Sequence, residues 1–200
     1  MDVSGYGSPV FAFEMAETPA HLEAIFGVES DPNRADRITM MDQGNVWDFG
    51  FMILYAAFLA LFSLSVYQAS KKKIMLVSAV IGLSSGCFDG IENIILLKLT
   101  SDFYALDLLK MLWMPVYAKF IAIALSSFGA AYYIYQTDNR VWKPVGAVAV
   151  LATLTSFVAL ASPAQFGWLL KHTIALSWLP MLVFAGYRSF VDNDETNSDT

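Results

Sequence analysis

The chain has 200 residues, of which 56% are hydrophobic and 15% are charged, and its formal net charge at pH 7 is −6. Soluble domains carry about 25% charged and about 45–50% apolar residues, so the composition excludes a water-soluble globular fold and indicates an integral membrane protein. Nucleic acid is excluded as a partner, because binding it requires a basic surface.

The first 47 residues are polar, and we expect them to form an extramembrane segment. The chain does not begin with a basic stretch followed by an apolar core, so we expect no cleaved signal peptide. Thr18 and Pro19 are typical of the start of a helix, and Gly27 is typical of its end. They predict a short amphipathic helix that either lies on the membrane surface or caps the bundle. A simple connector is favoured over a functional lid.

Five apolar runs follow, each about as long as the 20 residues that a helix needs to cross the hydrocarbon core. They cover residues 49–67, 74–99, 108–135, 145–161 and 166–187. The expected fold is therefore all-α, a polytopic bundle of about five transmembrane helices. Only a short turn separates the last two runs, so they form either two crossings or one kinked, re-entrant segment.

These runs divide the chain into three parts. We expect an extramembrane segment over residues 1–47 and the transmembrane bundle over residues 48–190. The remaining residues, 191–200, are acidic and polar, and this composition predicts a disordered tail.

Lysine and arginine gather at one end of the predicted bundle. They lie between the first and second runs, between the third and fourth, and after the fifth, as Lys71, Lys72, Lys73, Arg140, Lys143 and Arg188. The opposite connections, at 100–107 and 162–165, contain neither residue type. Because cytoplasmic loops carry the excess of positive charge, we expect a multi-pass protein of the cell (plasma or inner) membrane. Its N-terminus would be non-cytoplasmic and its C-terminus cytoplasmic.

The second run has one small, polar face and one apolar face. At 100° per residue the polar face collects Gly82, Ser85, Gly86, Asp89, Gly90, Glu92 and Asn93. The three glycines repeat every four residues, the spacing that lets a second helix approach closely. Packing alone is the favoured interpretation of the glycines, and a homo-oligomer contact through them is the alternative partner interaction.

The two carboxylates on this face need compensation. A charged carboxylate at the centre of a membrane helix costs about 2.5–3.5 kcal/mol on insertion scales. Asp89 lies about 15 Å from the outer end of its run, and Lys119 on the third run lies about 16 Å from its outer end, at 1.5 Å per residue. We therefore expect Asp89, Glu92 and Lys119 to meet in the outer half of the membrane.

Other polar side chains fall near the same depth. Tyr55 is on the first run, and Lys171 and His172 are on the fifth. The formal charges of Asp89, Glu92, Lys119 and Lys171 sum to zero, as a buried network requires. Each side chain has a simpler interpretation: Lys171 can extend to the headgroups, His172 can be a packed histidine, Tyr55 can be a core aromatic, and Asp48 can cap the first span.

The expected binding site is a polar pocket formed by Asp89, Glu92, Asn93, Lys119, Tyr55 and His172, with a structural ion network as the alternative. We expect it to bind a small or lipid-like ligand, and membrane lipid to be the other partner. The same carboxyl groups also fit an acid–base enzyme acting on a lipid or isoprenoid, or a proton-coupled carrier. A nucleophile–base pair is not recognisable, and a carrier with five spans and no inverted repeat would be unusual.

We expect neither a metal nor a cofactor. Cys87 is the single cysteine, which excludes a cysteine-based zinc site and an intrachain disulfide. The two histidines are too few for a di-iron site, and His21 lies outside the expected spans, so it cannot hold a haem together with His172.

Overall fold

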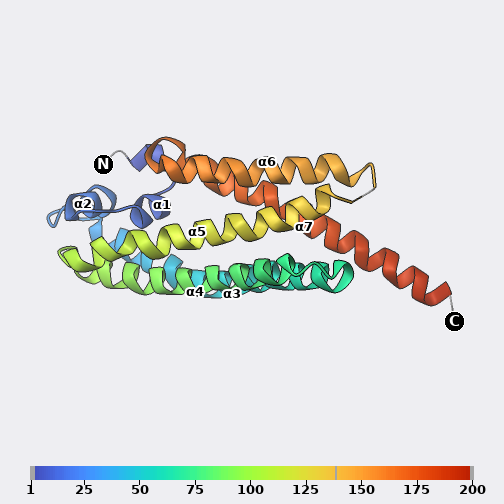
Figure 1. The fold of residues 1–200 in the computed structure, drawn as a ribbon. Coiled ribbons are helices and arrows are strands. Elements are labelled where there is room, and N and C mark those ends of the chain that lie inside the picture. Colours follow the sequence, from blue (N-terminus) through green and yellow to red (C-terminus); the bar gives the residue numbers. More distant parts are fainter. Residues whose placement is uncertain (1–2, 138, 199–200) are drawn as a thin grey trace.

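The computed structural model describes residues 3–137 and 139–198 and consists, over those residues, of helices and the turns that join them (Figure 1). Three short N-terminal helices are followed by five long ones: η1 Val3–Tyr6, α1 Pro9–Glu14, α2 Pro19–Phe26, α3 Arg34–Ser70, α4 Ile74–Ser101, α5 Leu106–Tyr135, α6 Trp142–Ala161 and α7 Pro163–Ser198. Each of the five is long and apolar enough to cross a membrane. The predicted all-α fold of a multi-pass membrane protein is confirmed, with the last two runs forming separate helices.

The long helices alternate in direction. Figure 1 shows the α3–α4 and α5–α6 turns at the end of the bundle where the C-terminus also lies, and the short N-terminal helices toward the other end. Five long helices joined by short turns place the N-terminal helices and the C-terminus at opposite ends of the bundle. α7 is helical as far as Ser198, and the predicted disorder of the acidic tail 191–200 stays a prediction.

Small residues hold α4 against α3. A Cβ added at Gly86 would lie 2.9 Å from the Ala56 Cβ, and one added at Gly82 would lie 2.8 Å from the Leu59 Cβ. The glycine spacing therefore produces close packing within one chain. Association between copies through these glycines stays a prediction, and the intrachain contact accounts for the spacing without it.

Helix α3 begins much earlier than its apolar run. It starts at Arg34 with Asn33 as its N-cap residue, so Asp48 lies inside the helix and the prediction that it caps the span is wrong. The apolar run marks only the part of a helix that faces lipid. The polar stretch 34–47 contains no proline, and Gly44 alone does not stop the helix from extending outward.

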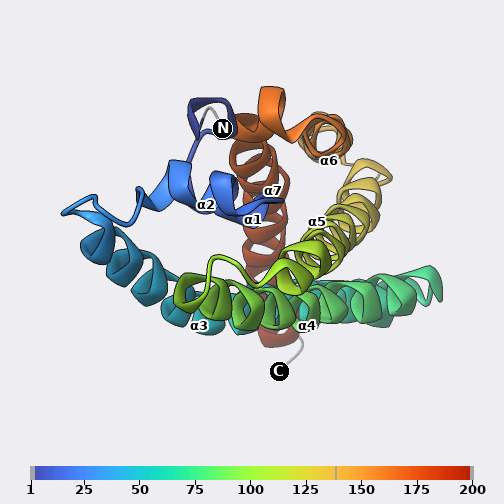
Figure 2. The ribbon, with the colours of Figure 1, turned by 90° about the vertical axis from the view of Figure 1, so that its left-hand side faces the viewer.

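The N-terminal helices pack onto the end of the bundle. Thr18 Oγ1 accepts a hydrogen bond from the His21 backbone N at 3.3 Å, Pro19 is the first residue of α2, and Gly27 ends it at φ +96°. The predicted short helix is confirmed. Buried aromatic and apolar side chains join α1 and α2 to α4 and α5, among them Phe13, Phe26, Leu96, Leu99, Phe103 and Leu112. Figure 2 shows α1 and α2 covering this end between α3 and α7.

Candidate functional site

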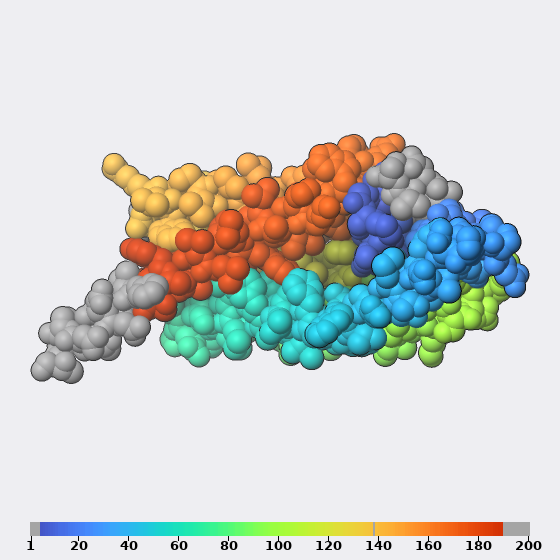
Figure 3. Space-filling view, turned by 180° about the vertical axis from the view of Figure 1, so that it is seen from behind, coloured from blue at the N-terminus to red at the C-terminus, as the bar shows by residue number. Residues whose placement is uncertain are grey.

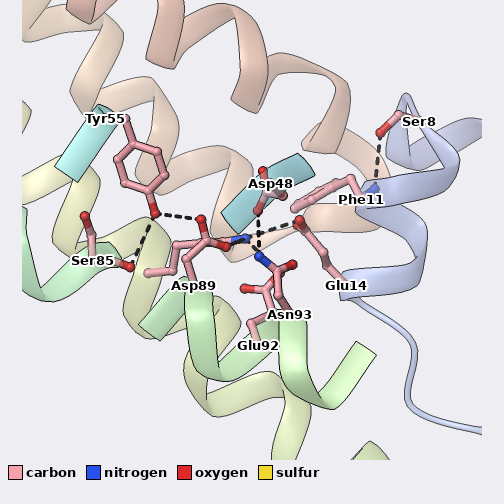
Figure 4. Close-up of polar contacts among 10 residues, drawn as sticks. Ser8, Phe11, Glu14, Asp48, Tyr55, Ser85, Asp89, Glu92 and Asn93 are labelled. Carbon is pink, nitrogen blue, oxygen red and sulfur yellow. Dashed lines mark hydrogen bonds and ion pairs between the residues drawn. The ribbon is translucent and has the colours of Figure 1, made fainter. Parts of the chain in front are cut away.

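Lys119 lies at the centre of a buried ionic cluster near the middle of α5. Its Nζ is 2.7 Å from Glu92 Oε1, 3.0 Å from Asp89 Oδ1 and 3.2 Å from Glu14 Oε1. Figure 4 shows the carboxyl groups of Glu14, Asp89 and Glu92 pointing toward one another between α1 and α4. The structure therefore brings together the three charged residues that depth along the helices predicts to meet.

Hydrogen bonds from neighbouring side chains fix the edge of this cluster. Tyr55 on α3 donates its hydroxyl to Asp89 Oδ2 at 2.7 Å. One turn along α4, Asn93 donates its Nδ2 to Asp48 Oδ2 at 2.8 Å. Both contacts join α3 to α4 (Figure 4), so α1, α3, α4 and α5 each contribute a polar group to one layer.

Glu14 belongs to the cluster although its helix is outside the predicted spans. Ser8 caps α1, with its Oγ accepting from the Phe11 backbone N at 3.2 Å, and the ring of Phe11 packs on Phe120 with 5.7 Å between centroids. These contacts hold α1 beside α5, so that the last residue of α1 reaches Lys119. The pattern that could have revealed this helix is Ser8-Pro9 followed by four apolar residues, which is typical of a capped helix start.

Negative charge exceeds positive charge in the cluster. Three carboxyl groups surround one ammonium group, whereas the predicted neutral set used Lys171, which is exposed. Glu14 Oε2 and Glu92 Oε2 are buried and have no hydrogen-bond partner among the described residues. Asp89 Oδ1 approaches Lys119 as an ion pair without hydrogen-bond geometry. Burial raises the pKa of Glu14, with nearby Asp89 adding to the rise and Lys119 opposing it.

A cavity of about 330 Å³ adjoins the cluster. Its walls come from α1, α3, α4, α5 and α7 and comprise Glu14, Asp48, Phe51, Tyr55, Asp89, Lys119, Phe120, Ile123, Lys171, Ile174, Ala175 and Trp178. Figure 3 shows a hollow between α7 and α3, with α5 at its bottom and the N-terminal helices beside it. Buried ionisable groups and aromatic rings thus share one space that opens on the side of the bundle.

Two further cavities are larger but differ in chemistry. One, of about 410 Å³, lies between α3, α5 and α7, and the other, of about 490 Å³, lies between α4 and α5. Their linings are mainly apolar, and the basic residues in them, Arg188 and Lys72, are exposed rather than buried. Only the 330 Å³ cavity among these three is lined by buried ionisable side chains.

The predicted site residues divide into two groups. The structure places Tyr55, Asp89, Glu92, Asn93 and Lys119 in one hydrogen-bonded and ion-paired layer. His172 is instead exposed and lies beside Trp168, with 6.4 Å between ring centroids. It is adjacent to the cavity residue Lys171 but does not line the cavity, because its position turns it to another face of α7.

The described residues contain no group of three or more His, Cys, Asp or Glu side chains placed to hold a metal ion. Lys119 occupies the space between the three carboxyl groups that would otherwise be the candidate ligands. The side chains that meet at this site can form ion pairs and hydrogen bonds and can exchange protons.

No protein-family model, curated protein or solved structure matches the chain. The ionic cluster around Lys119 and the cavity beside it are the features of the chain that bear on its function.

Proposed function

We propose that this multi-pass membrane protein binds a small or lipid-like ligand in the cavity beside Lys119. The observation that supports this proposal most is the meeting of the 330 Å³ cavity with the buried side chains of Asp89 and Lys119. Ionisable side chains inside a membrane bundle are costly and mark ligand or ion sites. Ligand pockets combine mainly apolar walls with a few convergent polar groups, as this cavity does.

A purely structural ion pair accounts for the cluster less well. Buried pairs are stable when both charges are matched and their remaining atoms are hydrogen-bonded. Here one ammonium group is shared by three carboxyl groups, and oxygens of Glu14 and Glu92 have no hydrogen-bond partner among the described residues. An arrangement with spare acceptors beside an open cavity favours ligand binding over structural support.

We also propose that the cavity lies in the outer half of the cell membrane, with the N-terminus on the non-cytoplasmic side. The support is the distribution of basic residues. Lys71, Lys72 and Lys73 in the α3–α4 turn lie at the end of the bundle away from α1 and α2. Positive charge of this kind marks cytoplasmic connections.

Native mass spectrometry of protein extracted from its own membranes tests ligand binding. Ala175 lines the cavity, whereas the next residue, Leu176, is 50% exposed and does not line it. We expect the wild-type protein and the matched control Leu176→Trp to carry a bound small molecule, and Ala175→Trp to lose it because the indole fills the cavity. A wild-type protein without bound mass, or equal retention by Ala175→Trp, would contradict the proposal.

A role in proton transfer is a second candidate, favoured by the shared ammonium group. Three carboxyl groups around one lysine cannot all be ionised cheaply, so the cluster has the means to hold an exchangeable proton. A proton carrier predicts a proton flux in liposomes that Glu92→Gln abolishes. An acid–base enzyme predicts a membrane lipid whose turnover is lost in Asp89→Asn while ligand retention persists.

A further inference from the structure

The charge around the cavity favours a positively charged ligand. Six ionisable side chains line the cavity or pair with the residues that do: Glu14, Asp48, Asp89, Glu92, Lys119 and Lys171. Four of them are acidic and two are basic, so negative charge still exceeds positive charge when one of the four carboxyl groups holds a proton. A ligand carrying a positive charge would reduce this imbalance, whereas an anionic ligand would increase it.

The buried lysine offers little to an anionic ligand. An ammonium group has three donors, and the Lys119 ammonium is surrounded by carboxyl oxygens of Glu14, Asp89 and Glu92 at 2.7–3.2 Å. Two of these contacts are hydrogen bonds and the third, to Asp89, is an ion pair, so the positive charge is already compensated within the protein. The acceptor oxygens Glu14 Oε2 and Glu92 Oε2, in contrast, have no hydrogen-bond partner among the described residues. The groups at this site without a partner are therefore carboxyl oxygens, which suit a hydrogen-bond donor or a cation.

Aromatic rings line the same cavity. Phe51 and Tyr55 lie with 5.5 Å between ring centroids, and Tyr55 and Trp178 with 5.6 Å. The indole of Trp178 is held in place because its Nε1 donates to Ser127 Oγ at 2.9 Å. Aromatic faces attract organic cations, and cages of such rings bind quaternary ammonium groups. A bare inorganic ion prefers a site made of oxygen ligands alone. The aromatic rings beside the carboxylates distinguish this site from one of that kind.

We propose that the ligand is a hydrophobic organic cation, a protonated amine or quaternary ammonium group on an apolar chain. Its charged group would lie near Asp48, Asp89 and Trp178, and its chain would follow the apolar wall of Ile174 and Ala175. Entry is from the side, through the hollow between α3 and α7 (Figure 3). This inference rests on the proposed function and adds the chemical class of the ligand.

Thermal unfolding of the purified full-length protein in a non-ionic detergent tests the ligand class. The probes share one alkyl chain and differ in their polar group: dodecyltrimethylammonium and dodecylamine are cationic at neutral pH, dodecanol is neutral and dodecanoate is anionic. We expect both cations to raise Tm in a saturable manner, because a ligand that binds only the folded state stabilises it. Dodecanol and dodecanoate should leave Tm unchanged at the same concentrations.

Two variants connect that effect to the cavity. Asp48→Asn keeps an acceptor for Asn93 but removes a charge, and Trp178→Leu removes a ring. Each should weaken dodecyltrimethylammonium binding about tenfold. Trp113→Leu is the matched control, because Trp113 is 63% exposed on α5 and lies outside the cavity, and its affinity should equal that of the wild type.

The following outcomes would overturn the inference that the ligand is an organic cation. Equal stabilisation by dodecanol or dodecanoate shows that the alkyl chain alone is recognised. Stabilisation by sodium chloride with no further effect of the amines indicates an inorganic cation. If a bound molecule is lost in Ala175→Trp while neither amine raises Tm, the cation assignment fails and the proposed ligand-binding function stands. If no bound molecule is found at all, the proposed function fails independently.

Discussion

Lys119 is 5% exposed, and its ammonium group is the positive charge shared by Glu14, Asp89 and Glu92. Removing one partner of a buried ion pair costs about 3–5 kcal/mol, because the remaining charge is left uncompensated. We therefore expect Lys119→Met to lower the stability of the detergent-solubilised protein by about that amount. Adding Glu92→Gln to this variant should restore part of the loss. Denaturant unfolding measures both, and full stability of Lys119→Met would contradict the ionic cluster.

Glu14 gives the cluster a defined pH dependence. Burial raises its pKa above the ordinary value of 4.5, so the folded state holds the proton more tightly than the unfolded state. Its contribution to stability is complete below the unfolded pKa and is lost as pH rises through the raised value. Tm should fall as pH rises above the ordinary value of 4.5, and Glu14→Gln should flatten this slope. Lys119, Asp89 and Glu92 also face the Glu14 carboxyl group. A Tm that rises over this pH range would contradict the raised pKa of Glu14.

Individual site residues could be predicted only where a regular helix fixed their depth. Asp89 and Lys119 lie on long, uninterrupted apolar helices, so counting residues from the end of each helix predicted their level correctly. Glu14 could not be placed in this way, because it is the last residue of a six-residue helix whose position depends on packing of Phe11 and Phe13. His172 does not join the cluster for another reason. Equal depth does not specify which face of a helix a side chain occupies.

At the scale of the helix pair, Gly86 and Gly50 allow a matched comparison. A Cβ at Gly86 would lie 2.9 Å from the Ala56 Cβ, whereas one at Gly50 would have no neighbour within 4 Å. Both changes to alanine improve helix propensity by up to about 1 kcal/mol, so their difference reports packing. We expect Gly86→Ala to destabilise the protein by about 1–3 kcal/mol and Gly50→Ala to leave it unchanged or more stable. Equal effects in an unfolding measurement would show that α4 does not pack on α3 in this way.

The five long helices were predictable because lipid imposes a minimum length of apolar sequence. The starting points of the helices were less predictable, since a helix can continue into water on polar residues, as α3 does from Arg34. The Thr18–Gly27 helix was predictable from its capping residues alone. α1 has the same kind of start at Ser8 and Pro9, followed by four apolar residues, so its capping residues could have located it in the same way.

For the whole molecule, the orientation in the membrane is testable with single cysteines. Tyr104, in the α4–α5 turn, and Lys72, in the α3–α4 turn, are exposed at opposite ends of the bundle. In a Cys87→Ser background, an impermeant maleimide added to intact cells should label Tyr104→Cys at once. Lys72→Cys should be labelled only after the membrane is permeabilised. The reverse pattern would place the N-terminus and the cavity on the cytoplasmic side.

The convergence of three carboxyl groups on Lys119 is the claim on which the site depends. Solid-state NMR on the protein in lipid bilayers can measure the distance between an isotope-labelled lysine side-chain nitrogen and labelled aspartate and glutamate carboxyl carbons. The Lys119 signal is identified by its disappearance in Lys119→Arg. We predict that carboxyl carbons lie within about 4 Å of the Lys119 nitrogen, the range of an ion pair. A Lys119 nitrogen with no carboxyl carbon within about 6 Å would contradict the cluster and the ligand site built on it.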